Sequence, residues 1–399
     1  MPAVEIKENV YWIGVNDRTT DLFEGIWPIS KEGVSYNAYL IKDKKNMIID
    51  LAKAFKSDEF FDQINDMIEF KDLDYVVINH LEPDHSGVLR TLLKLAPGVT
   101  MLCSAKCKDM LANFYGVTEN VQVVQDEEII DLGGRKIQFF MTPFVHWPET
   151  MVTYDLKDQI LFSCDAFGSY GAFRGTIFDD DCTDPEFYEK EALRYYVNIV
   201  AKFSGPVLKA IAKLADVDVR IIAPSHGLVW RKDPAKIVRL YKEWAEYATQ
   251  PAKAAVTLIY ASMYGNTEKM MNAVAQGISS TGMDVEVFDV ARTHVSYILP
   301  SLWIKSAVMI GVPTYEGSMF PLMSHVLDMA EVKRIQNKKA AIFGSFGWSG
   351  GAQKKLEKYF DPVKWELLDQ YEFCGAPTKE DLQKGFEFGE AFAKKVVNG

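Results

Sequence analysis

The chain has 399 residues, and this length favours two domains over one. Hydrophobic residues make up 48% and charged residues 25% of it, which is the composition of an ordinary soluble globular protein. The net charge of -11 repels phosphate backbones and anionic lipid, and so argues against nucleic acid or a membrane as the main partner.

The N-terminal stretch "MPAVEIKENVYWIGV" has no basic segment followed by a long apolar core, so no signal peptide is expected. No apolar run approaches the roughly 20 residues that span a bilayer. The five cysteines are scattered, odd in number and without a CxxC pair, which argues against a disulfide framework. These features predict a cytoplasmic protein.

Short apolar or alternating segments recur in the first 250 residues and predict strands. They cover residues 34–41, 46–52, 73–80, 99–104, 136–143, 151–156, 159–166 and 219–227. Helical patterns lie between them at residues 57–70, 188–203 and 233–248. This half is expected to be a mixed sheet domain with helices packed outside.

After residue 250 the pattern becomes a regular alternation of apolar strands and helices. Strands are expected at residues 254–262, 283–290, 306–314, 339–347 and 365–377, and a last helix at residues 379–397. Near-continuous apolar strands that alternate with helices predict a parallel, doubly wound sheet of about 150 residues. The predicted domains are therefore residues 1–250 and 251–399.

The loop "INHLEPDHSG" follows one predicted strand of the first half and concentrates polar side chains. Further histidine and carboxylate side chains follow later strands, and four of the six histidines fall in these positions. Isolated histidines in loops are usually structural, but nitrogen and oxygen donors gathered on several strand ends form a metal-ligand set. The candidate ligands are His80, Glu82, Asp84, His85, His146, Asp165 and His226.

Seven donors are too many for one ion and divide well between two. His80, Glu82 and His146 are assigned to one ion, and Asp84, His85 and His226 to the other, with Asp165 as the bridge. Two histidines and a carboxylate with open positions suit non-haem iron, whereas ligand type alone also allows zinc. His85 has an alternative role, in which it contacts a metal-ligating side chain instead of the metal itself.

The loop "SMYGNT" opens a helix after the first strand of the second half and offers hydroxyls and backbone N–H groups, as a phosphate cradle does. No lysine follows as a triphosphate loop requires, so a monoester such as FMN fits better than ATP, although an ordinary N-cap turn is equally consistent. The loops "GVPTYEGSMF" and "GSFGWSGGAQ" add aromatic cover and backbone donors at the same predicted sheet edge. The candidate FMN residues are Ser262, Met263, Tyr264, Gly265, Asn266, Thr267, Pro313, Thr314, Tyr315, Glu316, Gly317, Ser345, Phe346, Gly347, Trp348, Ser349 and Gly350.

The first half resembles the metallo-β-lactamase superfamily, whose hydrolases carry an HxHxDH loop. Here Glu82 gives HxExDH, which is the pattern of the flavodiiron proteins, and His146, Asp165 and His226 fall where that family's other ligands are expected. The second half resembles flavodoxin throughout. The resemblance implies an α/β chain with an N-terminal αββα sandwich and a C-terminal flavodoxin-like, doubly wound parallel sheet.

The same resemblance implies two non-haem irons and one FMN per chain, in a reductase that converts nitric oxide to nitrous oxide, oxygen to water, or both. Electrons are expected from rubredoxin or a similar carrier, and the chain is expected to form a head-to-tail homodimer or a dimer of dimers. The sequence does not distinguish the two gases. Two alternatives are a zinc hydrolase with an electron-transfer domain, which Glu82 opposes, and an electron carrier with a vestigial metal half.

Overall fold

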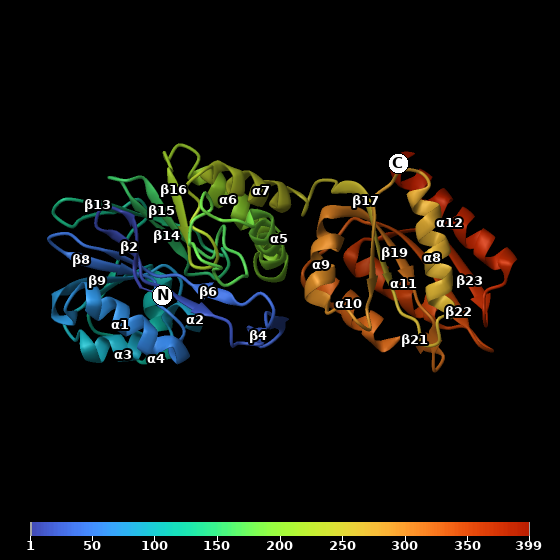
Figure 1. Cartoon of the computed structure of the whole chain (residues 1–399), viewed down its shortest axis with the longest axis horizontal. Coiled ribbons are helices and arrows are strands. Elements are labelled where there is room, and N and C mark those ends of the chain that lie inside the picture. Colours follow the sequence, from blue (N-terminus) through green and yellow to red (C-terminus); the bar gives the residue numbers. More distant parts are fainter. Residues whose placement is uncertain (1, 399) are drawn as a thin grey trace. The chain divides into compact units, whose positions relative to one another are not determined.

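The computed structural model describes residues 2–398. The chain divides into two compact units, Met1–Ala245 and Glu246–Gly399 (Figure 1). Each unit has its own sheets and its own hydrophobic core. Among the described residues, no helix combines the length and the apolar character required to cross a bilayer.

The first unit contains two large sheets that lie between helices. The seven-stranded sheet has the order β1 (Val4–Lys7), β2 (Val10–Trp12), β7 (Tyr39–Ile41), β8 (Asn46–Ile49), β9 (Leu73–Ile78), β10 (Thr100–Cys103) and β11 (Val121–Val123). The five-stranded sheet has the order β12 (Ile129–Asp131), β13 (Lys136–Met141), β14 (Met151–Asp155), β15 (Ile160–Cys164) and β16 (Ile221–Pro224). Two small ribbons pair β3 (Val15–Asp17) with β6 (Val34–Tyr36), and β4 (Leu22–Phe23) with β5 (Trp27–Pro28).

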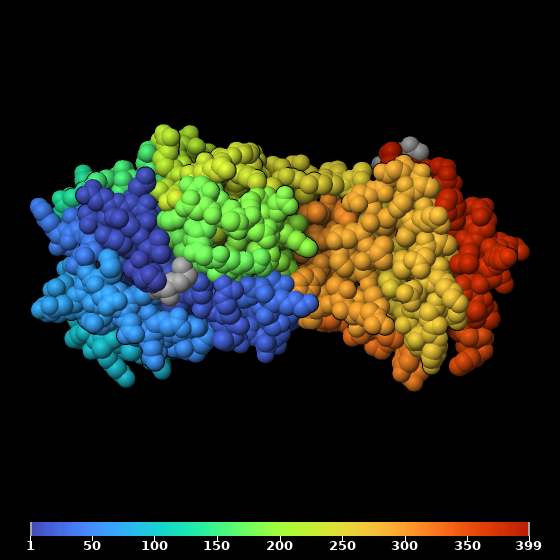
Figure 2. Space-filling model, viewed as in Figure 1, coloured from blue at the N-terminus to red at the C-terminus, as the bar shows by residue number. Residues whose placement is uncertain are grey.

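Helices cover the outer faces of both sheets (Figure 1). The seven-stranded sheet is covered by α1 (Ser57–Met67), α3 (Leu89–Leu95) and α4 (Ala105–Tyr115), and the other sheet by α6 (Ser204–Lys213) and α7 (Pro234–Glu246). Two further helices are α2 (Pro83–Ser86) and α5 (Pro185–Tyr195). On the face shown in Figure 2, the segment around β5 lies against α5. There Arg194 of α5 donates a hydrogen bond to the Pro28 carbonyl. The predicted αββα sandwich is thus confirmed.

One predicted strand of this unit, residues 34–41, is wrong in its extent. The structure divides it into β6 and β7, which belong to different sheets. The reason is Asn37, a buried residue between the two strands whose side-chain amide donates to the carbonyls of Pro224 and Gly227 over 2.8 and 2.9 Å. These bonds fix the chain to the loop after β16 and prevent a continuous strand.

The second unit contains a five-stranded parallel sheet in the order β18 (Val285–Asp289), β17 (Lys253–Tyr260), β19 (Lys305–Gly311), β22 (Lys339–Phe346) and β23 (Glu366–Cys374). Numbered along this unit the order is 2-1-3-4-5, which is the flavodoxin-like form of the doubly wound fold. The predicted fold of this half is therefore confirmed. A short hairpin, β20 (Thr314–Tyr315) with β21 (Ser318–Met319), follows the third strand of the sheet.

Helices pack on this sheet and bury its apolar strands. They are α8 (Asn266–Ser279), α9 (Val295–Ile304), α10 (Pro321–Val332), α11 (Ala352–Val363) and α12 (Lys379–Asn398). Helices α8 and α12 run side by side (Figure 1). They approach each other closely at Gly277, where an added Cβ would lie 2.0 Å from the Phe386 carbonyl oxygen. On α8, Met270 and Val274 enter the core, as the helical spacing of its apolar residues predicts.

Candidate metal centre and flavin site

The candidate metal ligands of the first unit lie on four segments that follow strands. His80 and Glu82 follow β9, whereas Asp84 and His85 lie within the short helix α2. The other three ligands follow β13, β15 and β16 and are His146, Asp165 and His226. Strands β13, β15 and β16 all run antiparallel to β14, so their carboxyl ends meet at one edge of the sheet.

A first group of donor atoms is formed by His80, Glu82, His146 and Asp165, whose ligand atoms all lie within 4.8 Å of one another. The Glu82 Oε2 atom is 3.2 Å from His80 Nε2 and 3.1 Å from His146 Nε2. The Asp165 Oδ2 atom is 3.3 Å from each of the same two nitrogens. Ligand atoms bound to one ion at about 2.1 Å, with tetrahedral or octahedral angles, lie ~3.0–3.4 Å apart.

A second group is formed by Asp84, His85 and His226, also within 4.8 Å of one another. His226 Nε2 is 3.3 Å from Asp84 Oδ2, and His85 Nε2 is 3.5 Å from Asp84 Oδ1. The other oxygen of Asp165, Oδ1, faces this group, at 2.9 Å from His85 Nε2 and 3.4 Å from His226 Nε2. The two oxygens of one carboxylate therefore face two separate donor groups.

The donor atoms fit a metal because several are buried without a hydrogen-bond partner. These are His146 Nε2, His226 Nε2, Asp165 Oδ2 and both carboxylate oxygens of Asp84. An unsatisfied buried polar atom costs about 1–3 kcal/mol, and more when it is charged. These five atoms are divided between the two donor groups, and a cation in each group would satisfy them.

Two of the imidazoles are held in the orientation that metal binding requires. The Nδ1–H of His80 donates to Glu149 Oε1, and that of His226 donates to the carbonyl oxygen of Ser35, each over 2.7 Å. A histidine that donates through Nδ1 keeps its other nitrogen, Nε2, free to bind a metal. In both residues it is Nε2 that faces the carboxylates.

The electrostatic potential at this site is strongly negative. Burial lowers the pKa of His226, but the adjacent carboxylates of Asp165 and Asp84 outweigh it and raise the pKa to about 10. In the same way, burial lowers the pKa of His146 while Asp165 and Glu82 raise it to about 9. The carboxylates thus stabilise positive charge, whether it is a proton or a metal ion.

The structure adds contacts that the sequence prediction missed. The hydroxyl of the buried Tyr195 donates to Asp165 Oδ1 over 2.8 Å, and Glu149 accepts from both His80 and the backbone N–H of Leu81. Glu149 follows His146 by only three residues, so its place in the same loop was a usable signal. Tyr195 ends α5, where the sequence carries no such signal.

The candidate flavin site is a cavity of about 370 Å³ at the carboxyl ends of strands β17, β19 and β22. Most of the predicted residues line it, namely Met263, Tyr264, Asn266, Pro313, Thr314, Tyr315, Glu316, Gly317, Ser345, Phe346, Gly347, Trp348 and Ser349. Ser262, Gly265, Thr267 and Gly350 do not line it, and Gly375, which was not predicted, does. Gly375 follows β23, so it belongs to the same edge of the sheet.

The site fits a flat aromatic group that carries a phosphate. Trp348 and Tyr264 are 94% and 88% exposed, so the ring of each is accessible for stacking. Gly265 adopts a left-handed φ of 86° before α8, and a Cβ there would meet no atom within 4 Å. The helix N-terminus beside it supplies the N–H groups and the dipole that bind phosphate.

Comparison with known proteins identifies both units. Residues 34–227 match the ODP family beta lactamase, and residues 258–389 match flavodoxin. The anaerobic nitric oxide reductase flavorubredoxin of Escherichia coli is 34% identical over 399 residues, covering 98% of this chain and 82% of the relative. A protein of Methanocaldococcus jannaschii is 34% identical and covers 98% of both chains.

Solved structures agree over the whole chain. The rubredoxin oxygen:oxidoreductase of Desulfovibrio gigas superposes with a TM-score of 0.92 at 30% identity and covers 99% of this chain and 98% of its own. The flavodiiron protein of Giardia intestinalis has the same TM-score at 28% identity, covering 100% and 97%. As the sequence resemblance predicted, the chain belongs to the flavodiiron proteins, a family of oxidoreductases.

Proposed function

We propose that the chain is a terminal reductase of nitric oxide, oxygen or both, with two irons in residues 1–250 and one FMN in residues 251–399. The observation that carries this proposal is the position of Asp165, whose two oxygens face two separate donor groups. A zinc or iron site with one ion needs no such bridge. The names of the Escherichia coli and Desulfovibrio gigas relatives support nitric oxide and oxygen as substrates.

The proposed ligands divide between the two irons as the donor groups do. His80, Glu82 and His146 bind one iron, and Asp84, His85 and His226 bind the other, with Asp165 as the bridge. His85 is included because its Nε2 is as close to the two carboxylates as the nitrogens of the other histidines are. Two histidines and one carboxylate around each ion leave positions open, as non-haem iron chemistry requires.

The iron pair, when bound, supplies the open positions at which a diatomic gas is reduced, and FMN supplies single electrons to that reaction. The protein's own residues orient the ligands and hold protons. Glu149 fixes the His80 tautomer, and Ser35 fixes that of His226. The Tyr195 hydroxyl keeps its proton and donates a hydrogen bond to Asp165 Oδ1, and burial raises the pKa of Tyr195 well above its usual value.

The proposed FMN residues are those of the three loops named above, with the phosphate at the N-terminus of α8 and the flavin ring near Trp348 and Tyr264. Reduction of oxygen to water consumes four electrons and four protons, whereas coupling of two nitric oxide molecules to nitrous oxide and water consumes two electrons and two protons. An external carrier must therefore replenish the flavin repeatedly. We propose rubredoxin or a similar carrier, because two relatives are named for rubredoxin.

We also propose a head-to-tail homodimer. Both cofactor sites lie at strand ends, one in each unit, and electron transfer between them is efficient only over short distances. A twofold interface that brings the flavin unit of one chain to the metal unit of its partner meets this need in both directions.

The proposed function is tested by turnover with reduced rubredoxin in solutions that are first made anaerobic. Either nitric oxide or oxygen is then added, and the two rates are compared. Consumption of either gas at a rate that depends on bound iron supports the proposal. A preparation with full iron and FMN that reduces neither gas contradicts it.

A further inference from the structure

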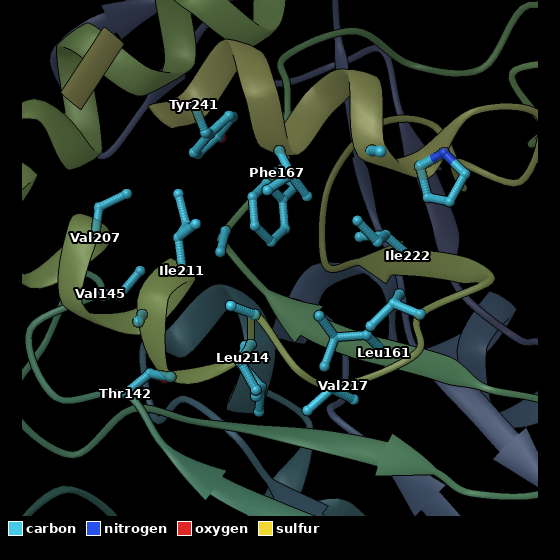
Figure 3. A pocket seen from close by; sticks show the side chains of 18 of the residues that line it. Thr142, Val145, Leu161, Phe167, Val207, Ile211, Leu214, Val217, Ile222 and Tyr241 are labelled. Atoms are coloured by element: carbon cyan, nitrogen blue, oxygen red, sulfur yellow. The ribbon is translucent and has the colours of Figure 1, made fainter. Parts of the chain in front are cut away.

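A large apolar pocket lies in the first unit between the five-stranded sheet and helices α6 and α7 (Figure 3). Its volume is about 440 Å³. Figure 3 shows the ring of Phe167 in its interior, with the side chains of Val207 and Ile211 from α6, and of Leu214 directly after α6, along one side. Leu161 and Ile222 of the sheet form the opposite side.

The inner wall of this pocket is built from two turns that carry proposed iron ligands. One turn runs from Asp165 to Gly168, whose N–H donates to the Asp165 carbonyl over 3.0 Å, and its central residues, Ala166 and Phe167, line the pocket. The proposed bridging residue is therefore the first residue of a turn whose middle faces the pocket.

The second turn runs from Thr142 to Val145, whose N–H donates to the Thr142 carbonyl over 3.2 Å. Both of its end residues line the pocket, and the ligand His146 follows directly. In each turn the third residue is a phenylalanine in the left-handed region, Phe144 with a φ of 65° and Phe167 with a φ of 69°. Glycine is the usual residue there, so each turn carries backbone strain.

The strain at Phe167 is retained by surrounding contacts. Its carbonyl accepts a hydrogen bond from Trp230 Nε1 over 3.1 Å, and its ring packs on Tyr241 with centroids 5.0 Å apart. The Tyr241 hydroxyl in turn donates to the Gly168 carbonyl over 3.0 Å. These contacts hold the turn that separates the pocket from the Asp165 side chain in one conformation.

The lining is mostly apolar, and its polar side chains are those of Thr142, Asp218, Arg239 and Tyr241. The Tyr241 hydroxyl is engaged by Gly168, while Arg239 and Asp218 are exposed and paired with Asp233 and Arg220. Sites for larger organic ligands combine apolar walls with several convergent polar groups. An apolar cavity of only about 150 Å³ already binds xenon or benzene, so a wholly apolar guest fits this pocket.

We propose that the pocket binds the apolar diatomic substrate next to the metal centre, behind the two ligand-bearing turns. This inference rests on the proposed function, because the gas is the substrate assigned there. Apolar gases leave water for apolar surroundings for the same reason as apolar side chains do. The pocket raises the local concentration of gas near Asp165 and His146, and so lowers the KM for the gas without changing kcat.

The test uses xenon as the probe in crystals of the holoprotein, together with gas-uptake kinetics. Xenon is expected in the pocket of the wild type and absent from Ala210→Phe, which fills the pocket from α6. The KM of Ala210→Phe for the gas is expected to rise severalfold at unchanged kcat and iron content. Ala212→Phe, at an exposed position of the same helix that does not line the pocket, is the matched control and is expected to match the wild type.

Val238→Phe fills the pocket from α7 and replaces Ala210→Phe if that variant does not fold. An empty wild-type pocket under xenon overturns the inference, and so does a filled pocket with an unchanged KM. Xenon binding requires no turnover. If the protein reduces neither gas, the proposed function fails by itself; if it reduces a gas while the pocket takes no xenon, only the pocket inference fails.

Discussion

The Nδ1–H of His80 donates a hydrogen bond of 2.7 Å to Oε1 of Glu149, and both side chains are fully buried. The same carboxylate oxygen accepts the backbone N–H of Leu81 over 3.0 Å. Glu149 therefore fixes both the ring orientation of His80 and the chain on which the ring is mounted. A carboxylate in this place also makes the imidazole a stronger metal ligand.

Replacement of Glu149 by alanine should weaken metal binding by about 10–100-fold, because the His80 ring loses its fixed tautomer and orientation. Glu149→Gln keeps an oxygen that accepts the hydrogen bond and should lose less. The affinities are measured by competition with a chelator. Glu189→Ala is the control, because this half-buried glutamate of α5 pairs with Lys236 and not with a metal ligand; equal affinity of Glu149→Ala and this control would remove the assigned role.

Asp165→Ala should release one or both metals while the flavin spectrum persists, since the bridge is lost and the second unit is unchanged. The measurement is iron content together with the visible absorption of bound FMN. Full iron and full activity in this variant would show that the bridge has been wrongly assigned.

Lys338 predicts a pH dependence of stability that is separate from the metal centre. Burial lowers its pKa to about 7, and its amine donates to the Trp303 carbonyl over 3.0 Å. Between pH 7 and the usual lysine pKa of about 10.4, the unfolded chain binds more protons than the folded chain, so stability rises with pH. The slope from this group is at most about 1.4 kcal/mol per pH unit.

Lys338→Met should remove this component of the slope, because the side chain keeps its bulk and loses the proton. The measurement is denaturant unfolding of holoprotein at several pH values from 7 to 10, followed by a probe of the second unit. A slope that is the same in the variant and the wild type would contradict the assignment.

The proposed dimer is tested with two inactive variants. One lacks a functional metal site through His80→Ala, and the other lacks FMN through Gly265→Val, since a β-branched residue is strained at a φ of 86°. Mixed dimers should recover activity at one of their two crossed sites if subunits exchange. A monomer that remains fully active at high dilution would exclude the dimer requirement.

The sequence predicted those parts of the two sites that depend on local pattern. Apolar strands such as β9, β15 and β16 end directly before polar residues, and strand ends of one sheet meet, so His80, Asp165 and His226 were found together. The loops that line the cavity of the second unit were predicted in the same way, and Gly375, which also lines it, was not predicted because its loop carries no aromatic residue.

The remaining parts depend on contacts between distant segments, which local periodicity does not specify. Tyr195 reaches Asp165 from the end of a helix, 30 residues further along the chain. Asn37 divides an expected strand because it bonds carbonyls near residue 226. The large apolar pocket has no sequence signature, since its lining has the composition of an ordinary core.

Metal and flavin analysis of an active preparation shows whether the protein has a site for two irons, bridged by Asp165 and supplied by one FMN. About two irons and one FMN per chain are expected, with activity proportional to iron. Zinc in place of iron in a fully active preparation, or one metal ion per chain at full activity, would contradict it.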